Sequence, residues 1–428
     1  MQQTKVLVFS AAFGNGHLRA AQAVMEAMRL KHPEVLIRHL DFGEFLNERL
    51  NRVLKKVYIK VVDRAPKLWE KFYYTTDRVE LNPEGRNYLT KLGRSKFLSY
   101  IREFQPDCIV CTHPTVSSIL AQLRLEGLLP VPVLTIVTDY AAHSHWVHRG
   151  VDRYIAACPE VKTELAAWGI EAERILETGI PVSPRFEENK SREDLLAELG
   201  LAPDVTVFLL MGGTFGSLRS AQRICQSLAD SSLAVQIIVV CGKNEKLYLS
   251  LAGVAARSRN RMRRFKFVDN VDELMTVSDL IITKAGGLTV SEALTKHLPL
   301  VVYRPIPGQE EENARYIERL GAGCLAKDEE ELGRLLAHFL QQPAEIARMR
   351  KKAALALPGR SAERAVEEIL SLISSQSPPG LGPETGVGLI LNDAVKGGEQ
   401  GGLVSGKSRP KGQVVGGVIA AENTVSDI

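Results

Sequence analysis

The sequence predicts an α/β protein made of two Rossmann-like halves that face each other across a cleft. Short apolar runs alternate with helix-patterned segments along most of the 428 residues, which indicates parallel sheets covered by helices on both faces. The alternation stops at a stretch rich in turn formers, residues 179–184, and then begins again. We therefore expect a first domain over residues 1–180, a second over residues 181–374 and a tail over residues 375–428.

In the first half, residues 5–10 form an apolar run that predicts a strand, and a glycine-containing loop joins it to a helix with Ala, Met and Leu at helical spacing over residues 18–30. Asp41 is expected to end a second strand. The same pattern predicts further strands at residues 107–111, 133–137, 154–157 and 175–179.

The second half repeats this pattern, with each predicted strand followed by a polar or glycine-rich loop. The strands are expected at residues 205–211, 235–241, 280–283 and 298–303. The first of them leads into Gly212, Gly213 and Thr214. Because ligands of such sheets bind beyond the carboxyl ends of the strands, these loops are the candidate binding segments.

Residues 375–428 differ in composition from the rest: they hold no aromatic residue, and 12 of the chain's 34 glycines lie between residues 380 and 417. This composition predicts a disordered tail. Within it, residues 401–408 (GGLVSGKS) match the phosphate-loop pattern. A phosphate loop needs a strand before it and a helix after it, and the flanking residues predict neither, so we interpret the match as a coincidence.

Composition and charge exclude several classes of protein. A net charge of +4 is too small for nucleic-acid binding through bulk charge. The apolar runs fall short of the roughly 18 residues that span a bilayer, and the N-terminal run does not match a signal peptide. Six cysteines give no disulfide framework, and Cys108 and Cys111 are expected in the core. We expect a cytoplasmic protein that touches membranes only peripherally.

The loop from Gly14 to His17 lies between the first predicted strand and helix, where small residues let a ligand approach the backbone and the helix N-terminus favours negative charge. A neutral His17 at the mouth of a cleft could take a proton from an alcohol, although a structural histidine at a helix start would look the same. Gly14, Gly16 and Ala20, together with Asp41, also fit a relaxed dinucleotide fingerprint, so an NAD-dependent oxidoreductase remains an alternative.

A second glycine loop follows the predicted strand at residues 280–283. Gly286 and Gly287 would expose backbone amides to a diphosphate, and Glu292 could turn back to the ribose hydroxyls. The alternative is a tight turn with a solvated glutamate. Further along, amide and carboxylate side chains suited to reading sugar hydroxyls cluster after a strand, although a solvated acidic helix start would look similar. They include Gln309, Glu310 and Asn313.

No metal site is expected. His143, His145 and His148 lack a flanking cysteine or acidic ligand at a fixed helical spacing. The chain also has no Asp-x-Asp pair of the kind that holds a sugar-nucleotide metal.

Residues 45–104 hold 14 Lys and Arg against 7 Asp and Glu, and 10 of the 26 aromatic residues. Basic residues here alternate with apolar ones, and Trp69 lies further along, a composition that suits the surface of an anionic membrane. An ordinary basic helix packed on the first sheet is the alternative. The basic candidates are Arg52, Lys55 and Lys56.

Several motifs occur in one order along the chain. They are Gly14 to His17, Thr138-Asp139, His143-x-x-Trp146-x-His148, Thr178 to Pro181, Cys241 to Asn244, Thr283 to Glu292 and Pro307 to Ala314. In this order they resemble the diacylglycerol glycosyltransferases, which comprise the bacterial processive diacylglycerol β-glucosyltransferases and the monogalactosyldiacylglycerol synthases of glycosyltransferase family 28. The resemblance runs from about Lys5 to Ile373 and implies the GT-B fold.

The resemblance also implies a reaction: inverting transfer of a hexose, glucose rather than galactose, from a UDP-sugar to the 3-hydroxyl of diacylglycerol at the inner face of the cell membrane. UDP-glucose or UDP-galactose would be a substrate, with no cofactor, no metal and no nucleic acid involved. A nucleotide-sugar-binding regulatory protein without turnover would need the same pocket and stays an alternative.

The resemblance assigns the base to His17, the diphosphate and ribose contacts to Gly286, Gly287 and Glu292, and the sugar contacts to Gln309, Glu310 and Asn313. The other candidates below rest on their own places in the sequence. His17 would be the base, with Asp139 orienting it or acting in its place. The acceptor or the membrane would meet Arg52, Lys55, Lys56, Trp69, Trp146 and His148. The donor would meet Gly212, Gly213, Thr214, Gly286, Gly287, Glu292, Gln309, Glu310 and Asn313.

Overall fold

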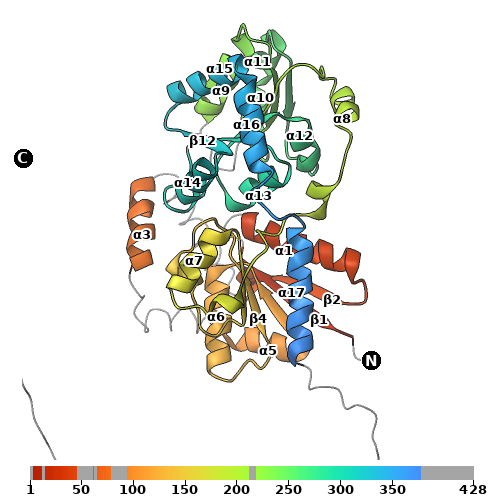
Figure 1. Cartoon of the computed structure of the whole chain (residues 1–428), viewed down its shortest axis with the longest axis vertical. Helices are drawn as coiled ribbons and strands as arrows, with labels where there is room; N and C mark the ends of the chain where they lie inside the picture. The colour runs from red at the N-terminus through yellow and green to blue at the C-terminus, as the bar shows by residue number, and fades with distance from the viewer. Residues whose placement is uncertain are drawn as a thin grey trace, which may run out of the picture. The chain divides into compact units, whose positions relative to one another are not determined.

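The computed structural model describes residues 3–11, 15–45, 61, 65–78, 94–211 and 218–376, all within one compact unit, Met1–Pro378. The unit contains two six-stranded sheets flanked by helices (Figure 1). Every strand pairing in both sheets is parallel. The predicted fold class, two Rossmann-like α/β halves, is confirmed.

The first sheet has the strand order β2-β1-β3-β4-β5-β6. Its topological switch point lies between β1 and β3, where ligands of doubly wound sheets bind. Helices cover both faces, so the central strands are apolar runs without polar alternation. The strands are β1 (Lys5–Ser10), β2 (Leu36–Asp41), β3 (Cys108–Cys111), β4 (Val133–Ile136), β5 (Arg153–Ala156) and β6 (Ile175–Glu177).

The second sheet has the order β12-β11-β10-β7-β8-β9, with its switch point between β7 and β10. The edge strands β9 and β12 are additions to the sequence prediction. The four residues of β9 are all only half-buried, and so are three of the four in β12. The strands are β7 (Val207–Met211), β8 (Gln236–Val240), β9 (Met262–Phe265), β10 (Leu280–Thr283), β11 (Leu300–Tyr303) and β12 (Gly323–Ala326).

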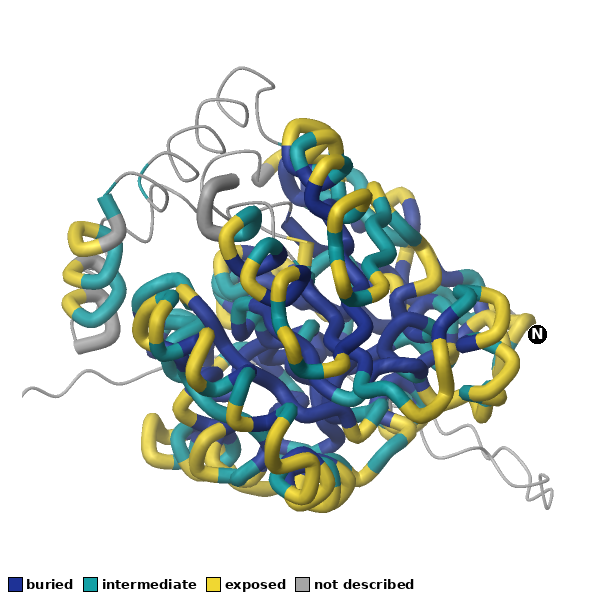
Figure 2. Tube along the Cα trace, turned by 90° about the horizontal axis from the view of Figure 1, so that it is seen from above, coloured by how far each residue is buried: buried dark blue, intermediate teal, exposed yellow. Residues whose placement is uncertain are grey.

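Each sheet carries helices on both faces, and Figure 2 shows the resulting pattern of buried inner segments and exposed outer ones. On the first sheet, α1 (Asn15–Lys31) and α17 (Ser361–Gln376) cover one face. The other face packs against α5 (Arg94–Phe104), α6 (Pro114–Leu125) and α7 (Pro159–Ala167). Among the described residues, 3-10 turns lie in the loops at η1 (Phe42–Glu44), η2 (Ser144–Trp146), η3 (Ala172–Arg174) and η4 (Pro184–Glu187).

The second sheet is covered in the same way. Buried side chains of one face pack with α9 (Leu218–Asp230), α10 (Glu245–Ser250), α11 (Ala252–Arg257), α15 (Glu329–Gln341) and α16 (Pro343–Ala353). Those of the other face pack with α8 (Arg192–Glu198), α12 (Val271–Val277), α13 (Gly287–Thr295) and α14 (Gln309–Leu320). One further helix, α3 (Pro66–Arg78), belongs to the basic segment of the first half.

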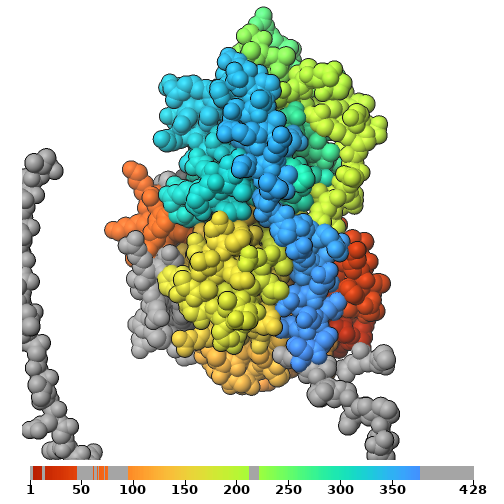
Figure 3. All heavy atoms as spheres, in the orientation of Figure 1, coloured from red at the N-terminus to blue at the C-terminus, as the bar shows by residue number. Residues whose placement is uncertain are grey.

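Helix α17 returns to the first sheet after the chain has completed the second (Figures 1 and 3). Its buried residues Ala365 and Ile369 belong to the same apolar cluster as Val6 and Val8 of β1. Sequence order placed this helix in the second domain, residues 181–374, whereas its packing completes the core of the first half.

The structure bears on two features of the composition. Cys108 and Cys111 are fully buried in β3, as predicted. Within the described part of the chain, no helix combines the length and the apolar character needed to cross a membrane. The tail motif at residues 401–408 lies outside the described residues.

Candidate active site

His17 lies in the first turn of α1, at the switch point of the first sheet. Its Nδ1 is 2.7 Å from the carbonyl oxygen of Thr112 and 2.9 Å from Oγ1 of Thr138. Because a carbonyl oxygen can only accept, Nδ1 carries the hydrogen and the lone pair of the neutral ring lies on Nε2. Among the described residues none hydrogen-bonds Nε2. The imidazole is thus held in the tautomer whose basic nitrogen is left for a ligand.

The surroundings of His17 keep the ring uncharged. Burial lowers its pKa to about 4, although the hydrogen bond to Thr112 acts in the opposite direction. The rings of His113 and Trp146 lie 4.8 Å and 6.2 Å from it, centroid to centroid. His17 is therefore a neutral acceptor at pH 7, as a general base must be before it takes a proton.

Asp139 is buried just after β4, and no hydrogen bond among the described residues joins it to His17. Its Oδ1 accepts a 2.5 Å hydrogen bond from Nε2 of Gln309, and its carboxylate also interacts with the side chains of Asn313 and Trp146. Burial raises its pKa to about 6. Thr112 and Thr138 orient His17 in the described structure, whereas Asp139 links the first half to α14 of the second.

Helix α13 packs against α1, and among the described residues no side chain caps its N-terminus. Gly286 is the N-cap without a side-chain cap, and the first turn holds no acidic residue. A Cβ on Gly287 would lie 2.1 Å from the carbonyl oxygen of Thr138, so only glycine allows this approach. The positive end of α13 therefore lies beside the segment that orients His17, where a diphosphate would be stabilised.

Glu292 lies further along α13 and is also buried. Burial raises its pKa to about 7, and its Oε1 is 3.4 Å from Nη1 of Arg19 on α1, which acts in the opposite direction. Arg19 was not among the predicted site residues. The carboxylate predicted to hold the ribose is thus paired, in the described structure, with a cation from the first half.

Asn313 is fully buried and hydrogen-bonds two backbone groups. Its Oδ1 accepts from the backbone nitrogen of Tyr140 at 2.8 Å, while its Nδ2 donates to the carbonyl oxygen of Ala285 at 2.9 Å. Tyr140 also pairs with Ser291 on α13 through its hydroxyl, at 2.8 Å. These contacts fix the loop before α13 against the loop after β4.

Glu310 also binds a backbone group within the second half. Its Oε2 accepts from the backbone nitrogen of Ile306 at 2.6 Å, and burial raises its pKa. Its Oε1 would lie 3.9 Å from a Cβ on Gly286, so the carboxylate faces the start of α13. Gln309 and Glu310 therefore border the same space as the α13 N-terminus.

The structure describes only some of the remaining predicted residues. Trp146 is buried in η2 near His17, His148 is buried shortly after η2, and Trp69 lies on α3. Seven candidates lie outside the described residues: Gly14, Arg52, Lys55, Lys56, Gly212, Gly213 and Thr214. The described residues contain no group of three or more His, Cys, Asp or Glu side chains that could hold a metal ion.

Sequence reasoning missed Thr112, Arg19 and Tyr140 as site residues, and it counted Thr138 only as part of a motif. Thr112 and Thr138 could have been predicted as site residues, because both directly follow predicted strands of the first sheet. Arg19 and Tyr140 had no such signal, since their importance depends on contacts with α13 and α14, more than 150 residues away along the chain.

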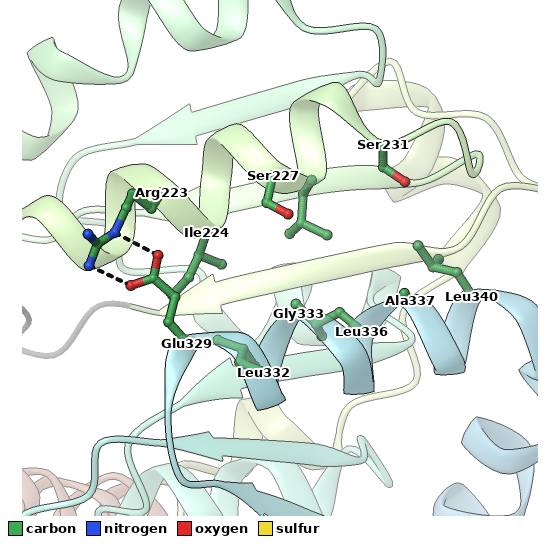
Figure 4. A pocket seen from close by; sticks show the side chains of 11 residues that line it. Arg223, Ile224, Ser227, Ser231, Glu329, Leu332, Gly333, Leu336, Ala337 and Leu340 are labelled. Atoms are coloured by element: carbon green, nitrogen blue, oxygen red, sulfur yellow. Dashed lines mark hydrogen bonds and ion pairs between the residues drawn. The ribbon is translucent and has the colours of Figure 1, made fainter.

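A hollow between α9 and α15 contains none of the predicted site residues (Figure 4). Aliphatic side chains line most of it, and its two charged residues, Arg223 and Glu329, pair with each other at 2.6 Å. It has no converging polar groups for a ligand, so we assign it no role.

Comparison with known proteins bears on this site. The family model described as monogalactosyldiacylglycerol (MGDG) synthase matches residues 17–182, and the glycosyltransferase family 28 C-terminal domain matches residues 207–368. Among solved structures, MurG of Acinetobacter baumannii has a TM-score of 0.55 at 17% identity, covering 86% of this chain and 99% of that one. A putative UDP-N-acetylglucosamine 2-epimerase of Listeria monocytogenes has a TM-score of 0.59 at 14% identity, with 89% and 99% covered.

Fold and site together define a glycosyltransferase of the GT-B class. Processive diacylglycerol β-glucosyltransferases of Bacillus cereus (strain B4264) and Bacillus anthracis (strain CDC 684 / NRRL 3495) are each 32% identical to this chain, over 82% and 87% of it and 89% and 94% of their own lengths. The chain belongs to this family, that of the processive diacylglycerol β-glucosyltransferases.

Family membership also excludes the alternative of an NAD-dependent oxidoreductase, in which Asp41 would bind the ribose of the cofactor. In the structure Oδ1 of Asp41 accepts a hydrogen bond from the backbone nitrogen of Gly43 at 2.7 Å and caps η1.

Proposed function

We propose that this protein transfers glucose from UDP-glucose to the 3-hydroxyl of diacylglycerol, with inversion, on the inner face of the cell membrane. The family gives the reaction class, and the named relatives favour glucose over galactose. A solved structure of HepE from Anabaena, in complex with UDP-glucose, shares the fold with a TM-score of 0.51. The observation that carries the mechanism is the neutral His17 beside the open N-terminus of α13.

In the proposed reaction, Nε2 of His17 accepts the proton of the acceptor hydroxyl as its oxygen attacks the anomeric carbon. The bond from that carbon to the UDP oxygen breaks, and negative charge develops on the leaving diphosphate. The amides at the start of α13 stabilise this charge where an Asp-x-Asp enzyme would use a metal ion. Gln309 and Glu310 border the space left for the hexose.

Thr138 offers a test of the His17 geometry. Thr138→Val removes the hydroxyl oxygen near Nδ1 at nearly constant volume, so the ring is held only by the Thr112 carbonyl. We expect kcat to fall about 10-fold, within the 0.5–1.5 kcal/mol worth of one hydrogen bond, with the KM for UDP-glucose little changed. Thr138→Ser, which keeps the hydroxyl, should retain most of the activity. Equal kcat values in Thr138→Val and wild type would show that Thr112 alone orients the ring.

Glu292 gives the donor site a pH dependence. Its pKa of about 7 means that the carboxyl is protonated below neutral pH and ionised above it. An ionised carboxylate accepts hydrogen bonds from ribose hydroxyls best, so UDP should bind more tightly as the pH rises from 6 to 8. Calorimetry of wild type and Glu292→Gln across this range separates the carboxyl from the titration of UDP itself. If both proteins show the same pH dependence, Glu292 does not hold the ribose.

The exposed face of α3 supports binding to an anionic membrane. Lys67, Leu68 and Lys71 are exposed, and Lys71 lies about one helical turn beyond Lys67 and Leu68, so cationic groups flank an apolar side chain. The basic residues Arg52, Lys55 and Lys56 precede this helix in the sequence. This arrangement favours a peripheral enzyme that takes its lipid acceptor from the bilayer surface.

One experiment tests the proposed function. The purified protein is incubated with UDP-glucose or UDP-galactose and with anionic vesicles that contain diacylglycerol, and glycolipid and free UDP are measured. We expect both products from UDP-glucose, in equal amounts. UDP binding without glycolipid or UDP release would instead support a regulatory protein, and faster transfer from UDP-galactose would overturn the choice of glucose.

A further inference from the structure

Helix α3 of the first half makes a direct contact with the first turn of α14 in the second half. The hydroxyl of Tyr74 donates to Oε1 of Glu312 at 3.0 Å, between residues 238 positions apart. Burial and this hydrogen bond raise the pKa of Tyr74 to about 12, so the phenol keeps its proton at physiological pH. Figure 1 shows α3 beside α14.

A second contact fixes the other side of the same turn. A Cβ on Gly308, the N-cap of α14, would lie 2.6 Å from ring atoms of Tyr73, and Gly308 has a φ of +84°. Both the space and the backbone angle therefore require glycine. Tyr73 is itself held from the first half, because Nε2 of His143 lies 3.0 Å from its carbonyl oxygen and the two rings are 4.6 Å apart.

The turn held in this way carries the side chains that border the sugar space. Gln309 and Glu310 follow Gly308 directly, and they face Asp139 and the start of α13. Backbone hydrogen bonds couple the residues of one helical turn, so a shift of Gly308 or Glu312 also moves Gln309 and Glu310. The residues proposed to bind the diphosphate and the ribose, namely Gly286, Gly287 and Glu292, belong to α13 and its N-cap. They are not part of this turn.

We propose that Tyr73 and Tyr74 are positioning residues for the hexose: helix α3 of the acceptor half sets where the first turn of α14 lies and so helps decide which sugar is accepted. The inference rests on the proposed function, since it assigns the turn to the sugar of the donor. The proposed positioning role concerns the hexose alone and predicts no effect on the binding of UDP.

The test uses Tyr74→Phe in the full chain, which removes one hydroxyl and keeps the ring. We expect the KM for UDP-glucose to rise about 3- to 10-fold, as one lost hydrogen bond allows, while inhibition by UDP changes less than about 2-fold. The preference between UDP-glucose and UDP-galactose, as a ratio of kcat/KM values, should shrink by a similar factor. A purely structural role would weaken the binding of UDP and of UDP-glucose alike.

Two further variants make the outcome decisive. Glu312→Leu should raise the KM for UDP-glucose at least as much as Tyr74→Phe does, because it removes this hydrogen bond and also the ion pair of Glu312 with Arg315. Adding Tyr74→Phe to Glu312→Leu should have no further effect, because the hydrogen bond is already absent. Tyr100→Phe, on α5, is the matched control and should behave as wild type. Unchanged sugar preference in Tyr74→Phe, or a parallel rise in the KM and the UDP inhibition constant, overturns the proposal.

The result can be told apart from failure of the proposed function. If wild type transfers no sugar to diacylglycerol, the reaction assignment fails. Calorimetry then compares the affinity of UDP-glucose with that of UDP in wild type and in Tyr74→Phe. If the affinities of UDP-glucose and UDP differ less in Tyr74→Phe than in wild type, the positioning role is still supported. If they differ equally in both proteins, the positioning role is overturned.

Discussion

Replacing His17 by alanine is expected to lower kcat by about 100-fold or more while the affinity for UDP stays nearly intact. A general base acts in the transition state and contributes little to donor binding, and its removal typically costs about 10²- to 10⁴-fold. The Nδ1–H of His17 is already used by Thr112 and Thr138, so only Nε2 can accept the acceptor proton. Initial rates with saturating donor, together with UDP calorimetry, measure both quantities.

The matched control is His32→Ala. His32 directly follows the C-terminal end of α1 and pairs with Glu34. That variant should keep wild-type kcat. Wild-type turnover in His17→Ala would remove the histidine from the mechanism and leave Asp139, whose raised pKa of about 6 is compatible with proton transfer, as the next candidate.

The second large effect is expected from Asn313→Leu, and it is an effect on stability. The leucine fills a similar volume but leaves the backbone N–H of Tyr140 and the carbonyl of Ala285 without the hydrogen bonds that Asn313 provides. A buried polar group left unpaired costs about 1–3 kcal/mol, so the two together should lower the free energy of unfolding by about 2–6 kcal/mol. Urea denaturation followed by fluorescence measures the change.

Asn189→Leu is the control for this prediction, because Asn189 is exposed in the loop before α8. Its effect should stay within about 0.5 kcal/mol. If Asn313→Leu has an equally small effect but loses affinity for UDP-glucose, then Asn313 contacts the sugar, as the sequence alone suggested, and does not serve to hold the two loops.

The sequence predicts the inner strands well because each one is buried on both faces. Residues 280–283 were expected to form a strand, and β10 has these bounds. The edge strands β9 and β12 escaped prediction for the opposite reason. β9 reads Met-Arg-Arg-Phe and has a partner on only one side, so two of its side chains are charged and the apolar run that marks the other strands is missing.

The candidate site shows a similar limit. Loops that follow strands at a switch point are predictable, and the candidates His17, Gly286, Gly287 and Glu292 lie in or just after such loops. What each side chain contacts depends on how distant segments pack. The pairing of Arg19 with Glu292 joins residues 273 positions apart, and no local pattern marks it. For the same reason the buried Asn313, expected to read a sugar, binds backbone groups on both sides.

The return of α17 to the first sheet has a consequence for how the chain is made. Ribosomes release the N-terminal half first, and domains often fold as they emerge. Here, however, the apolar surface formed by Val6, Val8 and Met28 lacks its cover until residues 361–376 have been synthesised. The half that is translated first is therefore completed last, and during that interval its apolar face is exposed to solvent.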